Sequence, residues 1–162
     1  LAVVTKQDDI TGIEDDVFMY FGMGCRNVSL IFLPLGYDVE KLKQRFKKYA
    51  YISDFHKYKN NYDYHKALLI MNNISFEDGD FFLLQNKEDL HSPISVINVV
   101  YYKDITQVEE FVSQHKEELQ CVVADKFSPL SKIETVPFGL AQKPRLDNFA
   151  DGVNTMLFLA RV

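Results

Sequence analysis

The stretch TGIEDDVFMYFGMGCRNVSLIFLP, residues 11–34, decides the fold because it places a helical pattern, a glycine-rich break and an apolar run in succession. The Thr-x-x-Glu spacing at its start is that of a capping box, and apolar residues follow at helical spacing, so we expect a helix to begin there. Gly22 and Gly24 offer the left-handed conformation that ends a helix. Residues 29–34 then predict a buried strand.

Strand and helix patterns alternate on both sides of this stretch. Further strands are predicted by apolar or β-branched runs at residues 1–4, 80–85, 94–102 and 119–124. Further helices are predicted by apolar residues at helical spacing over residues 38–49, 64–71 and 104–118. Residues 52–63 show no clear period and are predicted to be irregular, and residues 155–162 are predicted to form the last strand. Because strands that alternate with helices are joined by crossovers, we expect an α/β fold with a mainly parallel, twisted sheet flanked by helices.

Size and charge limit the classes of function. The chain has 162 residues, the size of one domain, and its 47% hydrophobic and 25% charged residues are typical of a folded globular protein. The formal net charge of −5 argues against nucleic acid as a partner, since nucleic-acid-binding proteins present a basic surface to phosphate groups. No apolar run approaches the roughly 20 residues that cross a bilayer, so no membrane span is expected.

Cysteine and histidine are too few and too scattered to predict a disulfide framework or a metal site. Cys25 and Cys121 form no Cys-x-x-Cys pair, and the four histidines show no His-Glu-x-x-His spacing. No signal peptide opens the chain. We therefore expect a cytoplasmic protein that binds no metal, and we expect Cys121, which lies within an apolar strand pattern, in the core.

Cys25 is the strongest candidate for chemistry. It lies between the predicted helix and the predicted strand, beside glycines that let a substrate approach the backbone. Arg26 would favour the thiolate, the form of cysteine that attacks a carbonyl carbon. The backbone N–H groups after the cysteine would face a developing oxyanion. The alternative is a buried structural cysteine, which is the commoner role of a single cysteine.

The sequence around Cys25 resembles that of a known family. Residues 16–29, DVFMYFGMGCRNVS, are followed by an apolar strand with Pro34 and by Gly-Tyr-Asp at residues 36–38. This pattern is similar to the segment around the catalytic cysteine of the bacterial fatty acyl-CoA reductases, which include the fatty acid reductase of bacterial luminescence. They belong to the aldehyde dehydrogenase superfamily. The resemblance implies an aldehyde dehydrogenase-like catalytic domain in which Cys25 is the nucleophile.

A second block adds two candidates for binding a cofactor. Residues 88–94, EDLHSPI, are similar to the Glu-Glu-x-Phe-Gly-Pro-Val block of aldehyde dehydrogenases. In that block the second acidic residue holds the ribose hydroxyls of the nicotinamide cofactor and the aromatic residue lies beside the nicotinamide. The resemblance assigns these roles to Asp89, which is one methylene shorter than Glu, and to His91, which is more polar than Phe. A capped turn before a strand that begins at Pro93 explains the same residues.

The resemblance also implies a function, the NAD(P)H-dependent reduction of a long-chain acyl-CoA, or another acyl-carrier thioester, to a fatty aldehyde. The Cys25 thiolate would expel the coenzyme A thiol and form an acyl-enzyme, which hydride from NADPH or NADH would reduce. Three alternatives remain: an aldehyde dehydrogenase that works oxidatively, an acyl thioesterase or acyltransferase that needs no cofactor, and a non-catalytic interaction domain.

The extent of the protein follows from the same resemblance. Residues 1–162 resemble the C-terminal catalytic domain of a longer reductase, with Pro137-Phe-Gly139 as part of the matching tail. We therefore expect a cofactor-binding domain and the general base to lie upstream, and the isolated chain to be inactive. Members of the superfamily commonly associate through their terminal strands, which makes the predicted strand 155–162 a candidate interface for a homo-oligomer.

Overall fold

The computed structural model describes residues 1–6, 8–125, 127, 133–146, 148–149 and 153–160. The described residues form a seven-stranded sheet in the order β3-β4-β5-β2-β1-β6-β7. The strands are β1 (Ala2–Val3), β2 (Leu30–Pro34), β3 (Phe76–Asp78), β4 (Leu83–Asn86), β5 (Val96–Tyr102), β6 (Val122–Val123) and β7 (Thr135–Val136). Neighbouring strands are parallel, except that β3 is antiparallel to β4. The predicted α/β class with a mainly parallel sheet is confirmed.

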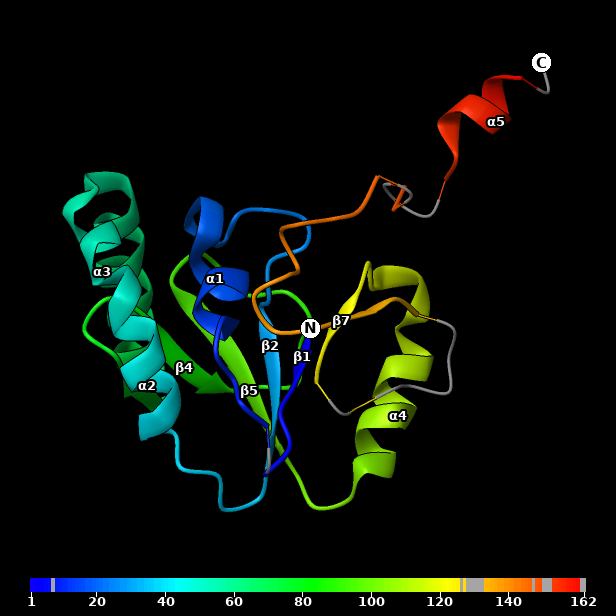
Figure 1. Cartoon of the computed structure of the whole chain (residues 1–162). Coiled ribbons are helices and arrows are strands. Elements are labelled where there is room, and N and C mark those ends of the chain that lie inside the picture. The colour runs from blue at the N-terminus through cyan, green and yellow to red at the C-terminus, as the bar shows by residue number, and fades with distance from the viewer. Residues whose placement is uncertain (7, 126, 128–132, 147, 150–152, 161–162) are drawn as a thin grey trace.

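Helices cover both faces of this sheet, as Figure 1 shows. The helices are α1 (Ile13–Phe18), α2 (Glu40–Phe46), α3 (His56–Met71), α4 (Ile105–Gln114) and α5 (Thr155–Leu159), with 3-10 turns η1 (Met19–Gly22), η2 (Lys47–Asp54) and η3 (Lys116–Glu118). Helices α1 and α2 pack on one face of the sheet, around Phe18 and Phe46, whose ring centroids lie 4.9 Å apart. Helix α4 packs on the other face, where Phe111 meets Phe32.

Strand β2 lies at the centre of the sheet, and all five of its residues are buried. Leu30 and Phe32 belong to the core on the α4 side, whereas Ile31 and Leu33 belong to the core on the side of α1 and α2. A strand with helices on both faces has no solvent-facing side chains, which explains why this segment is a continuous apolar run rather than an alternating one.

The prediction for residues 52–63 is wrong, because most of this segment is helical. Residues 52–54 belong to η2, and α3 extends from His56 to Met71. Tyr58 and Tyr62, one helical turn apart, are both buried, while the three residues between them are all polar. The helix therefore has a narrow aromatic stripe, which the expected aliphatic period does not reveal.

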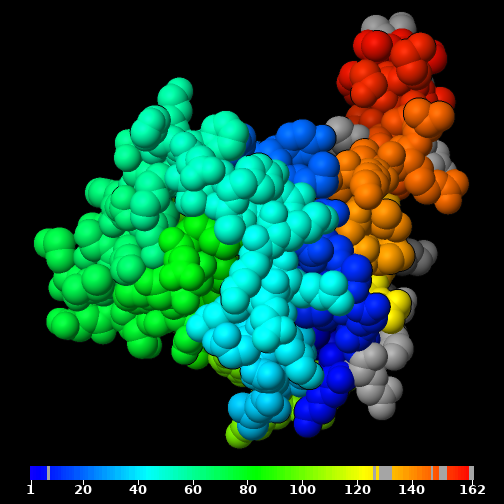
Figure 2. Space-filling view, turned by 60° about the vertical axis from the view of Figure 1, so that its left-hand side comes forward, coloured from blue at the N-terminus to red at the C-terminus, as the bar shows by residue number. Residues whose placement is uncertain are grey.

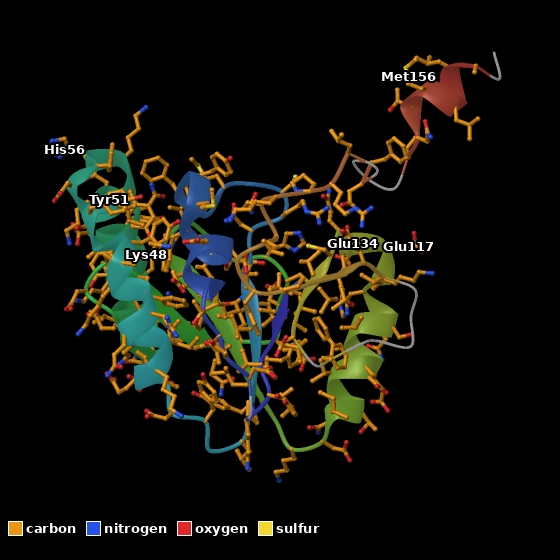
Figure 3. All side chains as sticks on the ribbon, viewed as in Figure 1. Lys48, Tyr51, His56, Glu117, Glu134 and Met156 are labelled. Atoms are coloured by element: carbon orange, nitrogen blue, oxygen red, sulfur yellow. The ribbon has the colours of Figure 1, made fainter. Side chains whose placement is uncertain are left out.

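The prediction of a C-terminal strand over residues 155–162 is also wrong. Residues 155–159 form α5, and residues 161–162 lie outside the described part of the chain. The Asn154 side chain accepts a hydrogen bond from the N–H of Leu157, as an N-cap residue does, and this favours a helix. The helix projects from the body of the protein, and its Met156 side chain is 78% exposed (Figures 2 and 3). None of the described helices is long and apolar enough to span a membrane.

Candidate functional site

Cys25 lies in the loop between η1 and the amino end of β2, as the sequence predicts, and it is exposed. The chain reaches this loop through three consecutive residues in the left-handed region, Tyr20, Phe21 and Gly22, with φ angles of 56°, 61° and 72°. Glycine adopts this conformation freely, but an aromatic residue does so at a cost of about 1 kcal/mol or more. Backbone strain of this kind clusters at functional sites in proteins.

The side chain of Asn27 holds the Cys25 loop against the end of α1. Its amide nitrogen donates, at 2.9 to 3.1 Å, to the backbone carbonyls of Asp16, Val17 and Met19. Its carbonyl oxygen accepts a hydrogen bond from the N–H of Gly24. Because one side chain joins the end of a helix to the residues on both sides of Cys25, it determines where the thiol lies.

Arg26 joins the same loop to a segment more than 100 residues away. Its Nε donates to the carbonyl of Ala141 at 2.8 Å, and its Nη2 lies 3.1 Å from a carboxylate oxygen of Glu134. Glu134 precedes β7 and is labelled in Figure 3. The guanidinium is therefore engaged by the 134–141 segment, and these contacts give Arg26 a positioning role beside Cys25.

Asp16 anchors the 134–141 segment from the other side. Its side chain is completely buried, and its two carboxylate oxygens accept hydrogen bonds from the N–H groups of Gly139, at 2.6 Å, and Ala141, at 2.9 Å. Burial raises the pKa of this carboxyl to about 6, although the two hydrogen bonds act in the opposite direction. The base of the Cys25 loop thus contains a group that titrates near neutral pH.

We expect the stabilisation contributed by Asp16 to increase as the pH falls. The carboxyl titrates near 6 in the folded chain and near 3.8 in the unfolded chain, so the folded chain binds the proton first on acidification. The free energy of unfolding of the wild type, relative to Asp16→Asn, should therefore rise by about 2 kcal/mol between about pH 7 and about pH 4. Denaturant unfolding of both proteins across this range measures the difference, and the comparison cancels the titration of other carboxylates. If the difference in the free energy of unfolding between the two proteins did not change with pH, this result would contradict the burial of an ionised Asp16.

A pocket of about 230 Å³ opens beside Cys25 at the amino ends of β1, β2, β5 and β6. Its wall includes Cys25 and His91, so the structure brings together two of the three residues that the sequence singles out. Cys121 also lines this pocket, but it is buried, as predicted, and burial raises the pKa of its thiol. An exposed thiol and a buried thiol therefore share one cavity.

Asp89 is not part of the pocket wall. Its carboxylate lies 2.7 Å from the Lys87 ammonium, which lowers the pKa of Asp89, and it accepts a hydrogen bond from the N–H of His91. The Asn98 side chain, from β5, donates to the carbonyls of Asp89 and His91 and so fixes this loop. The Ser29 hydroxyl donates to the carbonyl of the intervening Leu90. The loop that carries His91 is thereby tied to the strand that follows Cys25.

Two backbone N–H groups beside the thiol have no acceptor among the described residues, those of Cys25 and Arg26. The next two N–H groups are engaged, because Asn27 donates to the carbonyl of Gly24 and Val28 donates to that of Asp16. Adjacent free donors next to a nucleophile are the arrangement that stabilises an oxyanion formed when the nucleophile attacks a carbonyl carbon. The loop therefore carries a thiol and two donors of the kind that acyl transfer to sulfur requires.

Sequence reasoning missed Asp16, Asn27 and Asn98 as residues that shape the site. Asn27 carries a local signal, since an asparagine three residues after a glycine in a loop commonly bonds to nearby backbone. Asn98 also carries one, because it is a polar residue within an otherwise apolar strand and must find partners there. Asp16 gives no local signal, because its partners are 123 and 125 residues away.

No metal centre emerges at this site. Within the described ranges, no three side chains of His, Cys, Asp or Glu are grouped so that they could hold a metal ion. His56, at the start of α3, points outward from the body of the protein (Figure 3) and is not part of the pocket wall.

Comparison with known proteins gives a likeness of fold. No family model matches the sequence, and no curated protein matches it. The fold is similar to that of a solved aldehyde dehydrogenase structure, described as the substrate-bound state of Staphylococcus aureus AldH, with a TM-score of 0.50 and 13% sequence identity. The likeness covers 84% of this chain and 38% of that one, so the chain spans well under half of the length of its structural neighbour. The fold is thus aldehyde dehydrogenase-like.

Proposed function

We propose that this chain is the catalytic part of an enzyme that reduces a long-chain acyl thioester, such as an acyl-CoA, to an aldehyde through an acyl group on Cys25. The observation that carries the proposal is the placement of an exposed thiol in a pocket, next to two backbone N–H groups that lack an acceptor among the described residues. The resemblance of the Cys25 segment to acyl-CoA reductases and the aldehyde dehydrogenase-like fold support it.

Acylation follows from this arrangement of groups. The Cys25 sulfur, as thiolate, forms a bond to the acyl carbon while the carbonyl π electrons move to oxygen, where the N–H groups of Cys25 and Arg26 stabilise the charge. When the carbonyl re-forms, the bond to the carrier sulfur breaks, and the carrier thiolate leaves and takes a proton from water. Asn27 and Arg26 hold the loop so that the thiol and the donors keep their relative positions.

The cofactor side of the pocket is formed by the loop that contains His91. A bound NADPH or NADH would supply the hydride that converts the acyl-cysteine to an aldehyde and frees the thiolate. His91 lines the pocket, and its imidazole is 85% exposed, which leaves the ring available for contact with a planar nicotinamide ring. Asp89 would have to exchange its Lys87 contact to hold a ribose, since its carboxylate is only one-third exposed. We propose that the domain that binds the rest of the cofactor lies elsewhere in a longer protein.

The test is the acylation, by a long-chain acyl-CoA, of the longer protein that contains this chain, followed by intact mass. We expect one acyl adduct on the wild type and on Cys121→Ala, but none on Cys25→Ala, because the second thiol is buried in the same pocket. The Cys121 variant is the matched control, since it removes a thiol from the same cavity without touching the exposed one.

Other outcomes distinguish the alternatives. An adduct that persists in Cys25→Ala would contradict the assigned nucleophile. In the longer protein, an adduct that NADPH converts to free aldehyde supports the reductase. Release of the acyl group as a carboxylate without NADPH would identify a thioesterase, and turnover of aldehyde with NAD⁺ would identify an oxidising enzyme.

A further inference from the structure

A second cavity lies beside the pocket that contains Cys25. This cavity, which we call the slot, has a volume of about 40 Å³ and shares Gly22, Ser29 and Ser92 with the larger pocket. Its apolar walls include Val17, Phe18, Phe21, Val28, Ile94 and Ile97. A space of this size receives a few heavy atoms, since a single water needs roughly 10 to 15 Å³. The shared residues place the slot next to the pocket that contains the thiol.

Tyr58, from α3, also lines the slot and is the unexpected group there. Its side chain is 4% exposed, and its buried hydroxyl has no hydrogen-bond partner among the residues that the structure describes. Burial raises the pKa of this hydroxyl, so it remains protonated and can donate. Tyr62, one turn later on the same helix, differs, because its hydroxyl contacts Asp78 and Lys66.

Two other hydroxyl groups around the slot are already donating. Ser29 donates to the carbonyl of Leu90, and Ser95 donates to the carbonyl of Ile94. Buried polar groups in native proteins almost always have a hydrogen-bond partner. The hydroxyl of Tyr58, unpartnered among the described residues, therefore indicates that its partner is an atom of a molecule bound in the slot. Apolar walls with one hydrogen-bond donor suit an aliphatic chain that carries an oxygen atom.

The ring of Phe21 closes one side of the slot. Its centroid lies 5.1 Å from that of Phe55 and 6.3 Å from that of Tyr58. The left-handed backbone at Phe21 directs the ring to this position, immediately before the loop that bears the thiol. The strained turn and the slot are thus parts of one local structure.

We propose that the slot binds the distal part of the acyl group carried by Cys25, and that the Tyr58 hydroxyl donates a hydrogen bond to an oxygen substituent on that chain. The inference rests on the proposed function and adds a substrate class to it, an aliphatic thioester with a hydroxyl or ether oxygen. Gly22, which has no side chain, lines both the pocket of the thiol and the slot.

The first experiment compares acylation of Cys25 by two sets of thioesters, plain alkanoyl chains and chains of equal length with an oxygen placed at successive positions. The wild type should react faster with one oxygenated chain, by about tenfold, the usual effect of pairing a buried donor. Tyr58→Phe should react equally with both sets. Tyr62→Phe, the control on the same helix, should keep the preference. The melting temperature of Tyr62→Phe should fall, because the Tyr62 hydroxyl that it removes has hydrogen-bond partners. The melting temperature of Tyr58→Phe should be unchanged or higher, because the Tyr58 hydroxyl has no partner among the described residues.

The second experiment does not depend on the thiol. In Cys25→Ser, titration with 1-propanol should shift the NMR signals of the Tyr58 ring. In the double variant that also carries Tyr58→Phe, the titration is followed through the signals of the Phe21 ring. The apparent affinity for 1-propanol should be about tenfold weaker in the double variant. If no thioester acylates Cys25, the proposed function fails, and the alcohol titration still decides whether the slot binds an oxygenated chain. Acylation at equal rates with both sets, in wild type and Tyr58→Phe alike, would overturn the slot proposal alone. A slot that holds only water would show no alcohol-dependent shift, which would also overturn it.

Discussion

Gly12→Ala is expected to lower the free energy of unfolding by about 4 kcal/mol, the sum of a left-handed backbone cost and a steric cost against rigid backbone. Gly12 precedes α1 with φ of 98°, and a Cβ at this position would lie 2.7 Å from the Cα of Gly139. Neither backbone can move away easily, because the N–H of Gly139 is bonded to the buried Asp16. Denaturant unfolding measures the loss.

Gly36→Ala is the matched control for this experiment. Gly36 also has a left-handed φ, 79°, but a Cβ there would meet nothing within 4 Å. Only the conformational cost applies, so we expect a loss of about 1 kcal/mol. The difference between the two variants isolates the close approach of Gly12 to Gly139. Equal losses would mean that the 134–141 segment does not pack against the start of α1.

The central sheet can be predicted from the sequence because strands that are buried on both faces have continuous apolar runs. Strand β2 is a continuous apolar run, β5 is rich in β-branched residues, and helices separate the parallel strands. Such runs need no knowledge of distant residues, since each strand is apolar whatever lies beside it. The α/β class and the position of Cys25 at a helix-to-strand junction follow from these local patterns.

Two helices, α5 and α3, are not predictable from such patterns. The short apolar run in α5 fits a strand and a helix equally well by length, and only Asn154, as an N-cap, distinguishes them. Helix α3 buries Tyr58, Tyr62 and Leu69 among polar residues, so its stripe is too narrow to give a clear helical period. In both cases the deciding information is a cap or a tertiary contact rather than a periodicity.

The candidate site can be predicted only in part, because some of its features follow from local sequence and others from contacts between distant residues. The junction that carries Cys25 is local, and His91 reaches the same pocket through the strand order of the sheet. The contacts of Asp16 with Gly139 and of Arg26 with Glu134 span more than 100 residues, and no local pattern specifies them. The catalytic role of Cys25 and the cofactor roles of Asp89 and His91 stay predictions.

Asn27→Ala is expected to cost about 3 kcal/mol of stability, because it removes the donor that serves three carbonyl groups at the end of α1 and the acceptor for Gly24. Without this side chain the loop loses its fixed position relative to the helix. Acylation of Cys25 by an acyl-CoA should therefore slow by about tenfold or more, since misplacing a reacting group by a small distance has effects of this order or larger. Unfolding in denaturant and the rate of adduct formation measure the two effects.

Two further variants separate these hydrogen bonds from the loss of an amide in general. Asn72→Ala removes an exposed amide that donates to the carbonyl of Leu68 at the end of α3, and it should cost less than about 0.5 kcal/mol. Asn27→Asp keeps an acceptor for the N–H of Gly24 but places a negative charge against three carbonyl oxygens, at the negative end of a helix dipole. It should therefore be at least as destabilising as Asn27→Ala. If Asn27→Asp were as stable as the wild type, the carbonyl contacts could not be what holds the loop, and the position of the thiol would have to depend on Arg26 and its bonds to the 134–141 segment instead.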